Sequence, residues 1–473
     1  MDGGAISLLT SSSPDLPRGH LIHNMAPEIL GEIFIRCLPN PPKLVSSKNA
    51  PLLLLQVCRH WRQTARWTPR LWTELKLSQK AILQPARFLQ IWLDNAGSLP
   101  LKVTLPGHAK YPKEAEEVIE LLLDHFHRIS ELDGSLTPSF ASILLRCSQS
   151  FPIRAPFLKR LDVGCWDKLP SILDLERLRG CIIAPQLEVC NLNTSRFQLS
   201  LLRLDPTRLR ELCDLWVIEV AEFESMEILI SFTSLQTLTI FLQPALDVSV
   251  LKIPSIIPIP SLRRLQIATY PGYDPNLFPK ALDVAFIECL ELCSVQPGDL
   301  PLGPMLDSLT GGIIPPLKSL RLSGYNITAS ECMPWIRRFT ELETLTLEDG
   351  TFDLEALNLF SCGDSLKPSD FWICPHLSTL HLKRFKAPWN AMEDLVRSRA
   401  PTGDVGGRLR KVIFEASEGL GDLQKATFKT IQEDSRGWIQ FEFLPGWVRY
   451  DYTCFIRSNL HRVEKTIWLL IWA

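Results

Sequence analysis

The chain has 473 residues, 50 Lys and Arg against 52 Asp and Glu, and a net charge of −2. This length is too great for one compact core of ordinary size, so we expect several domains or an elongated array of repeats. Neither half of the chain carries a basic run, which argues against nucleic acid as a partner.

Thirteen cysteines are scattered along the chain without a Cys-x-x-Cys pair or the spacing of a small disulfide-rich domain. We expect them to be buried thiols in a reducing compartment. Residues 1–14 lack the charged and apolar regions of a secretory signal, and the longest apolar run, 467–473, is too short to span a bilayer. We therefore expect a soluble protein of the cytoplasm, the nucleus or both.

Two short helices are predicted near the N-terminus. In the first, apolar residues recur at helical spacing behind Pro27, which suits a first turn because it lacks an N–H. In the second, an apolar stripe through Leu54 and Ala65 is flanked by arginines and closed by Pro69. The helices are too short to bury both stripes against each other, so the module has apolar surface left for a partner.

This module resembles an F-box. Three strings occur together in the expected order: Pro-Glu-Ile-Leu-Gly-Glu-Ile-Phe at 27–34, Val-Cys-Arg-His-Trp at 57–61 and Leu-Trp at 71–72. In detail the stretch is most similar to the F-box-like proteins expanded in mushroom-forming (basidiomycete) fungi. That resemblance implies that the module binds a Skp-type adaptor and links a substrate-binding domain to a cullin-RING ubiquitin ligase. The adaptor-binding residues it implies are Pro27, Leu30, Ile33, Phe34, Leu54, Val57, Cys58, Trp61, Leu71 and Trp72. The alternative is an ordinary helical hairpin, with Trp61, Trp67 and Trp72 as plain core residues.

A capping region is predicted next. It comprises a short helix that Gly97 ends, a first strand over 99–105 and a charged helix over 114–128. These elements would cover the N-terminal edge of the domain that follows, where unpaired backbone would otherwise be exposed.

From residue 158 onward a Leu-x-x-Leu-x-Leu pattern recurs, with starts roughly 22 to 35 residues apart. The apolar triplets are Leu158, Leu161 and Val163; Leu187, Cys190 and Leu192; Leu235, Leu238 and Ile240; Leu262, Leu265 and Ile267; Ile287, Leu290 and Leu292; Leu317, Leu320 and Leu322; Leu342, Leu345 and Leu347; Leu377, Leu380 and Leu382; and Leu409, Val412 and Phe414. Leu209 and Leu212 begin a weaker copy. In each triplet the last two apolar residues alternate as in a strand, and such units must stack to bury their apolar faces.

The triplets resemble leucine-rich repeats, although Tyr325, Gly350 and Phe385 stand near the place of the usual asparagine or cysteine. We therefore expect an α/β fold: a short N-terminal helical F-box module, then an irregular leucine-rich-repeat solenoid whose curved, largely parallel sheet carries helices and loops on its outer side. A less ordered α/β arrangement is the alternative. The expected divisions are a flexible N-terminus at 1–20, the module at 21–78, the capping region at 79–150, the solenoid at 151–437 and a C-terminal cap or tail at 438–473.

No enzyme motif is present. His125-x-His127 lacks a third residue at metal-site spacing, and phosphate-binding loops and nucleophile elbows are missing. We therefore expect no catalytic residues, no cofactor and no metal, and consider an enzyme with an unrecognised site only as a third possibility.

The favoured function is that of a substrate-recognition adaptor, whose repeats bind an unidentified protein substrate. The alternative is a repeat scaffold in which the F-box-like hairpin is only a structural cap. From strand alternation alone, the substrate-binding residues are guessed to be Lys159, Arg263, Arg321, Thr346 and Lys383. Whether recognition requires a phosphate is left open.

Overall fold

The computed structural model describes residues 25–39, 46–78, 86–106, 115–135, 138–148, 151–164, 180–193, 202–217, 227–242, 258–269, 282–294, 302–310, 315–327, 335–355, 357, 374–386, 388–399, 409–415, 421–435 and 439–444. The predicted flexible segment 1–20 and most of the predicted tail, 438–473, lie outside them. By compactness the chain divides into two units, Met1–Phe157 and Leu158–Ala473.

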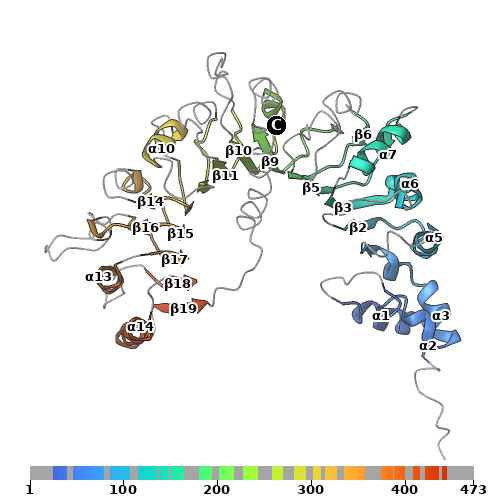
Figure 1. Ribbon diagram of the computed structural model, residues 1–473, viewed down its shortest axis with the longest axis horizontal. Helices are drawn as coiled ribbons and strands as arrows, with labels where there is room; N and C mark the ends of the chain where they lie inside the picture. Colours follow the sequence, from blue (N-terminus) through green and yellow to red (C-terminus); the bar gives the residue numbers. More distant parts are fainter. Residues whose placement is uncertain are drawn as a thin grey trace, which may run out of the picture. The chain divides into compact units, whose positions relative to one another are not determined.

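The first unit opens with a cluster of short helices (Figure 1). They are α1 (Pro27–Arg36), α2 (Leu54–Val57), α3 (Arg59–Arg66) and the 3₁₀ helix η2 (Pro69–Trp72). The second predicted helix is thus two helices, which corrects the prediction of a continuous stripe. The break lies at Cys58, whose extended backbone (φ −158°, ψ 174°) ends α2 while its sulfur accepts a hydrogen bond from the Trp61 N–H and caps α3.

Strands and helices then alternate through the rest of this unit: β1 (Glu74–Lys76), α5 (Ala86–Asn95), β2 (Leu101–Thr104), α6 (Glu116–Asp124), η4 (Phe126–Arg128), β3 (Ile129–Ser135), α7 (Pro138–Ser148) and β4 (Ile153–Arg154). β1 pairs parallel with β2, and β2 with β3. The predicted strand over 99–105 is β2, but β1 precedes it in the sheet. Gly97 follows α5 at φ +58°, the left-handed conformation that favours glycine after a helix.

A long parallel sheet dominates the second unit (Figure 1). In spatial order its strands are β5 (Arg160–Gly164), β7 (Val189–Asn193), β9 (Glu211–Val217), β10 (Thr237–Leu242), β11 (Arg264–Thr269), β12 (Cys289–Ser294), β13 (Ser319–Ser323), β15 (Thr344–Glu348), β17 (Thr379–Lys383), β18 (Lys411–Glu415) and β19 (Gln440–Leu444). Smaller parallel pairs join β6 (Ile182–Ala184) to β8 (Leu202–Leu204) and β14 (Asn326–Ile327) to β16 (Thr351–Phe352). Sequence order equals spatial order along the long sheet, so each strand pairs with the nearest strands before and after it.

Alternation along each strand divides the sheet into a leucine face and a polar face. On the leucine face, Leu265, Leu290, Leu320, Leu345 and Leu380 stand in one register row and are at most 3% exposed. The described side chains of the predicted apolar triplets are all buried. The triplets therefore located the core of this unit correctly, because one buried face forces a period of two.

Helices cover the leucine face of the sheet. Between the strands lie η6 (Glu227–Ser231), α10 (Leu302–Thr310), α13 (Trp389–Arg399) and α14 (Asp422–Asp434). Phe414 of β18 meets Trp389 of α13 edge-on at 5.7 Å and Phe428 of α14 at 4.9 Å between ring centroids. Aromatic contacts of this kind bury large apolar areas and fix the helices on the sheet. The sheet continues through β19, so the strands extend past the predicted end at residue 437.

The turns after the strands are filled by bulky side chains. Tyr325 and Phe385, which stand where a polar turn residue was expected, are 2% and 0% exposed. Gly350 lies directly against the carbonyl oxygen of Tyr325, so a Cβ at this position would collide with backbone. Bulky side chains thus fill these turns, and backbone hydrogen bonds link them, from the Gly324 N–H to the Glu348 carbonyl at 2.8 Å and from the Lys386 N–H to the Gly350 carbonyl at 3.1 Å.

Candidate functional site

Two regions of the chain carry apolar or charged side chains that a partner could reach. One is the N-terminal helical module, defined here as α1, α2, α3 and η2, and the other is the polar face of the long sheet. They belong to different compact units.

Helix α1 has an inner face and an exposed apolar face. Leu30 and Phe34 are each 2% exposed and point into the module, and Gly31 lets the helix approach Thr68, whose hydroxyl lies 2.8 Å from where a Cβ would stand. Ile29 and Ile33 are 57% and 39% exposed. A helix that keeps two isoleucines in water has apolar surface suited to a partner.

Trp72, the last residue of η2, is fully buried. Its indole N–H donates to the Ala65 carbonyl at 2.8 Å, and the Trp92 indole N–H donates to the Trp72 carbonyl at 2.7 Å. The two indole rings meet edge-on at 5.1 Å. Both indole N–H groups therefore have acceptors, and Trp72 joins the module to α5.

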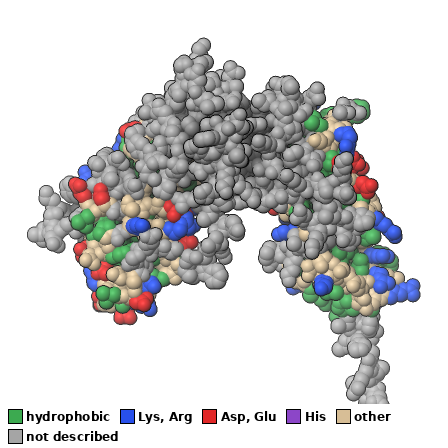
Figure 2. Space-filling view, viewed as in Figure 1, with side chains coloured by type: hydrophobic (Ala, Val, Ile, Leu, Met, Phe, Trp, Pro, Cys, Tyr) green, Lys and Arg blue, Asp and Glu red, His purple; other side chains and the backbone are tan. Residues whose placement is uncertain are grey.

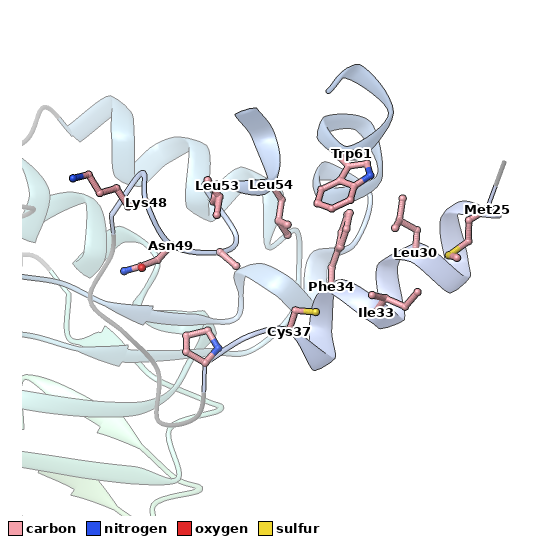
Figure 3. A pocket seen from close by; sticks show the side chains of 12 residues that line it. Met25, Leu30, Ile33, Phe34, Cys37, Lys48, Asn49, Leu53, Leu54 and Trp61 are labelled. Carbon is pink, nitrogen blue, oxygen red and sulfur yellow. The ribbon is translucent and has the colours of Figure 1, made fainter. Parts of the chain in front are cut away.

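An apolar cavity of about 400 Å³ opens beside α1 and α3 (Figure 3). The rings of Phe34 and Trp61 stand together in it, with their centroids 4.9 Å apart. Its lining residues are Met25, Leu30, Ile33, Phe34, Cys37, Pro39, Lys48, Asn49, Ala50, Leu53, Leu54 and Trp61. The volume suits one or two large apolar side chains of a partner, which is how helix-in-groove recognition works.

The structure separates the predicted adaptor-binding residues into two groups. Those that are buried are Leu30, Phe34, Leu54, Leu71 and Trp72, whereas those with accessible surface are Pro27, Ile33, Val57, Cys58 and Trp61. Leu71 and Trp72 are 2% and 0% exposed, so the structure leaves neither of them the surface that direct contact with a partner requires. Leu30, Phe34 and Leu54 still line the cavity.

Three exposed apolar residues of the module were absent from the prediction: Ile29, Leu53 and Trp67. Trp67 was considered only as a core residue, but it follows α3 and is 77% exposed. Its position after a helix that ends at Arg66 could have indicated this exposure, because a residue outside the helix need not lie on the helix's buried face.

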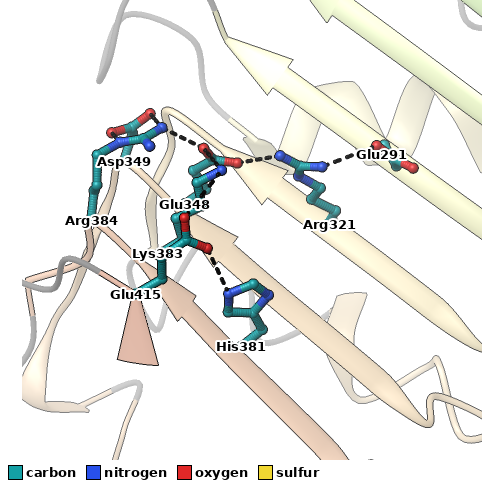
Figure 4. A network of polar contacts seen from close by, with 8 residues as sticks. All are labelled: Glu291, Arg321, Glu348, Asp349, His381, Lys383, Arg384 and Glu415. Carbon is teal, nitrogen blue, oxygen red and sulfur yellow. Dashed lines mark hydrogen bonds and ion pairs between the residues drawn. The ribbon is translucent and has the colours of Figure 1, made fainter. Parts of the chain in front are cut away.

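On the polar face of the sheet, charged residues form a network around Glu348 (Figure 4). This carboxylate is 0% exposed and receives ion pairs from Arg321, from Arg384 and, at 3.2 Å, from Lys383. The network extends to Glu291 and Asp349 through the arginines. A fully buried carboxylate with three cationic partners is a structural device, because its desolvation is offset only by those contacts.

A histidine stands at the edge of this network. His381 Nε2 lies 3.4 Å from Glu415 Oε2, and Lys383 Nζ lies 3.9 Å from the other oxygen of that carboxylate. Burial lowers the pKa of His381 despite the opposing effect of Glu415, and Lys383 and Arg321 lower it further. Burial also disfavours the charged form of Arg321, but Glu348 raises its pKa above the ordinary value.

The predicted substrate-binding residues do not form one site. Lys159 and Arg263 are exposed but precede β5 and β11, so they lie at the edge of the sheet and not on its strands. Arg321 and Thr346 lie side by side on the polar face and are partly exposed. Lys383 is only 5% exposed and its ammonium group pairs with Glu348, so it offers little surface to a substrate.

Arginines on this face already have acidic partners. Arg321 pairs with Glu348 and Glu291, and Arg384 pairs with Glu348 and Asp349. A phosphate would have to displace buried carboxylates to reach them, so the described residues of this network do not provide a ready phosphate site.

Within the described ranges, no group of three or more His, Cys, Asp and Glu side chains is arranged to hold a metal ion. None of the described helices combines the length and apolar character needed to cross a bilayer. His127, one of the paired histidines, has Nδ1 3.0 Å from the Asp124 carbonyl oxygen, a local contact at the end of α6.

The chain matches no family model and no curated protein. What the structure defines is an α/β protein with a large, parallel sheet and helices, and with a helical module in its first compact unit.

Proposed function

We propose that this protein is the substrate-recognition adaptor of a cullin-RING ubiquitin ligase of the SCF type, in which an F-box module binds a Skp-type adaptor and a leucine-rich-repeat solenoid binds a protein substrate. The single observation that carries the proposal is the exposed apolar surface of the module. Ile33 and Leu53, which line a cavity of about 400 Å³, and Val57 are 39–51% exposed. Monomeric proteins rarely leave such a surface uncovered unless a partner binds there.

The sheet supports the second half of the proposal. Several strands of the long sheet present partly exposed polar residues at alternate positions, as Ser319 and Arg321 do on β13 and Thr344 and Thr346 on β15. Parallel strands stacked in sequence order place these positions in rows, which is the arrangement that repeat proteins use to bind other proteins. The substrate would therefore contact the polar face and be brought to ubiquitin by other subunits.

The proposal is tested by binding of a purified Skp-type adaptor to the full chain, measured by titration calorimetry. We expect the double variant Ile33→Asp, Val57→Asp to bind at least about tenfold more weakly, because a carboxylate replaces an apolar contact at the centre of the interface. Leu423→Asp is the matched control, since Leu423 lies on α14 and is 78% exposed. Circular dichroism checks that all three proteins are folded.

The alternative function is a repeat scaffold in which the module only caps the fold. The fully buried Trp72, with its link to Trp92, favours this structural role. A folded parent that fails to bind the adaptor, or a double variant that binds as well as the parent, would establish this alternative and exclude the ligase function.

A further inference from the structure

The N-terminal helical module is strongly basic within a chain that is slightly acidic. Residues 25–39 and 46–78, which hold the module, its connecting residues and β1, contain seven Lys and Arg but only three Asp and Glu, a net charge of +4, whereas the whole chain carries −2. A local excess of one sign attracts a partner of the opposite sign without requiring the whole chain to be charged.

Three of these arginines form a row on α3. Arg59, Arg62 and Arg66 are spaced three and four residues apart and are exposed, whereas Thr64 and Ala65 on the opposite side are buried. They therefore share the solvent face of the helix.

The row lacks acidic partners. Arg62 Nε donates to the Leu55 carbonyl at 2.7 Å, and among the described residues no carboxylate lies within ion-pair distance of any of the three guanidinium groups. Arg70, in contrast, pairs with Glu32 at 2.8 Å. Like charges one turn apart repel each other, and an approaching carboxylate would relieve that repulsion.

Exposed apolar side chains bracket this row in the sequence. Val57 precedes it and is 51% exposed, and Trp67 follows it and is 77% exposed. Figure 2 shows Lys and Arg side chains beside hydrophobic ones on the surface of the N-terminal helices. The α3 surface, defined as Val57, Arg59, Arg62, Arg66 and Trp67, thus combines three guanidinium groups that have no carboxylate partner among the described residues with two exposed apolar side chains.

We infer that the α3 surface docks an acidic face of the Skp-type adaptor, one that presents carboxylates to the three arginines and apolar side chains to Val57 and Trp67. This inference rests on the proposed function, which names the partner but not the charge of its docking face. Guanidinium groups bind carboxylates in a planar, bidentate geometry, so the row also fixes the orientation of the partner. Trp and Arg are the residue types that dominate binding at such surfaces.

A protein carboxylate face fits better than a phosphate polymer. A row of three arginines matches a few carboxylates of a protein surface, whereas a nucleic-acid backbone presents a continuous array of phosphates that calls for a longer basic surface. Val57 and Trp67 also call for apolar side chains on the partner, which a duplex backbone does not offer.

The experiment follows association of the full chain with purified Skp-type adaptor by surface plasmon resonance between about 0.05 and 0.5 M salt. We expect the association rate of the parent to fall about tenfold or more across this range, because exposed charges act mainly on the encounter rate. The triple variant Arg59→Glu, Arg62→Glu, Arg66→Glu should associate at least about tenfold more slowly at low salt and lose most of the salt dependence.

The matched control reverses three exposed cations of the second compact unit: Arg210→Glu, Arg337→Glu and Lys429→Glu. It changes the net charge of the chain equally, so it should lower the rate far less if the α3 surface is the docking site. A milder variant, Arg59→Gln, Arg62→Gln, Arg66→Gln, keeps the test valid should the charge reversal unfold α3. The salt dependence of the unmodified parent is a further measurement that needs no substitution.

The outcomes separate this inference from the proposed function. Tight binding of the adaptor by both the parent and the triple variant, with the same salt dependence, would overturn the inference and leave the ligase function standing. An adaptor that binds independently of these arginines while they bind phosphatidylserine vesicles or a DNA duplex would overturn it as well. A folded parent that does not bind the adaptor at all would remove both.

Discussion

Buried Glu348 shows how a single side chain can hold several strands of a sheet in place. It accepts ion pairs from β13, from β17 and from Arg384 just beyond β17. The energetic importance of such a group is revealed mainly when it is removed, because its partners then lose the counter-charge that they share.

We expect Glu348→Ala to lower the free energy of unfolding by about 3–5 kcal/mol, since three cations would lose their buried partner. Urea unfolding followed by circular dichroism measures this. The control is Glu442→Ala, which breaks the exposed pair between Lys411 and Glu442 at 2.8 Å and should cost less than about 1 kcal/mol. Equal effects of the two substitutions would show that burial of Glu348 does not control its contribution.

His381 should make the stability of the second compact unit depend on pH. Its pKa in the folded chain is lowered by burial, so the unfolded chain binds a proton more readily, and the stabilising effect is complete above the unfolded pKa of about 6.5. The free energy of unfolding should therefore fall as the pH decreases from about 7 through the folded pKa. Glu415, Lys383 and Arg321 are the charged groups that face the ring.

The measurement compares urea unfolding of the parent and of His381→Gln at several pH values. The variant should show a flatter profile over this range, because glutamine does not titrate. A parent whose stability rises on acidification would instead indicate that Glu415 dominates and raises the pKa of the histidine.

At the scale of helices and strands, a cysteine that lines the cavity beside α1 can be used to detect whether the cavity is covered. Cys37 is exposed and lines the cavity, whereas burial raises the pKa of Cys181, Cys293 and Cys374 to about 12. Thiolates are the reactive form, so the three buried cysteines should be inert near neutral pH while Cys37 reacts.

We expect the adaptor to protect Cys37 from iodoacetamide, because the proposed interface covers the cavity that this side chain lines. Mass spectrometry of labelled peptides, with and without adaptor, measures the protection, and exposed Cys147 on α7 serves as the unprotected reference. Unchanged labelling of Cys37 in a complex that does form would place the interface elsewhere.

The strands of the long sheet were more predictable than the helical module, for a physical reason. In the sheet, residues such as Leu320 and Leu345 must alternate with polar neighbours because only one face is buried, and that period is visible in the sequence. In the module, Ile33 and Phe34 are adjacent and equally apolar, yet one is 39% and the other 2% exposed. Which of them turns inward depends on contacts with Trp61 and Leu54, which are distant in the sequence.

Breaks and turns escaped prediction for a related reason. The interruption of the second helix at Cys58 depends on a sulfur hydrogen bond, and the close approach of Gly350 to Tyr325 depends on two neighbouring turns. β19 has alternating Phe441 and Phe443 instead of leucines, so its two rings stack on Phe414 outside the pattern that located the other strands.

For the whole molecule, the strand order of the second unit predicts how far the effect of a destabilising substitution extends along the sheet. Each strand of the long sheet pairs only with its two neighbours, so stability should be set by adjacent pairs and not shared throughout. Leu322→Ala in β13 should cost about 2–5 kcal/mol locally, because this side chain is 1% exposed and its removal leaves a cavity.

Hydrogen exchange followed by mass spectrometry tests the extent of the loosening. We expect faster exchange in β12, β13 and β15 and little change in β5 or β19. The conservative variant Leu322→Met controls for substitution itself and should have a smaller effect. Equal acceleration in every strand would mean that the sheet opens as one cooperative body.

The ion pairs around Glu348 have a consequence for anyone who edits the length of this chain. Repeating units can in principle be deleted or duplicated, but here ion pairs link neighbouring units to each other. Removing the unit that contains β15 would bring Ser323 of β13 opposite Lys383 of β17 and leave Arg321, Lys383 and Arg384 without their shared carboxylate. A shortened protein should therefore be cut between β10 and β11, where uncharged Thr239 and Gln266 face each other. The units that the ion pairs around Glu348 join then stay together.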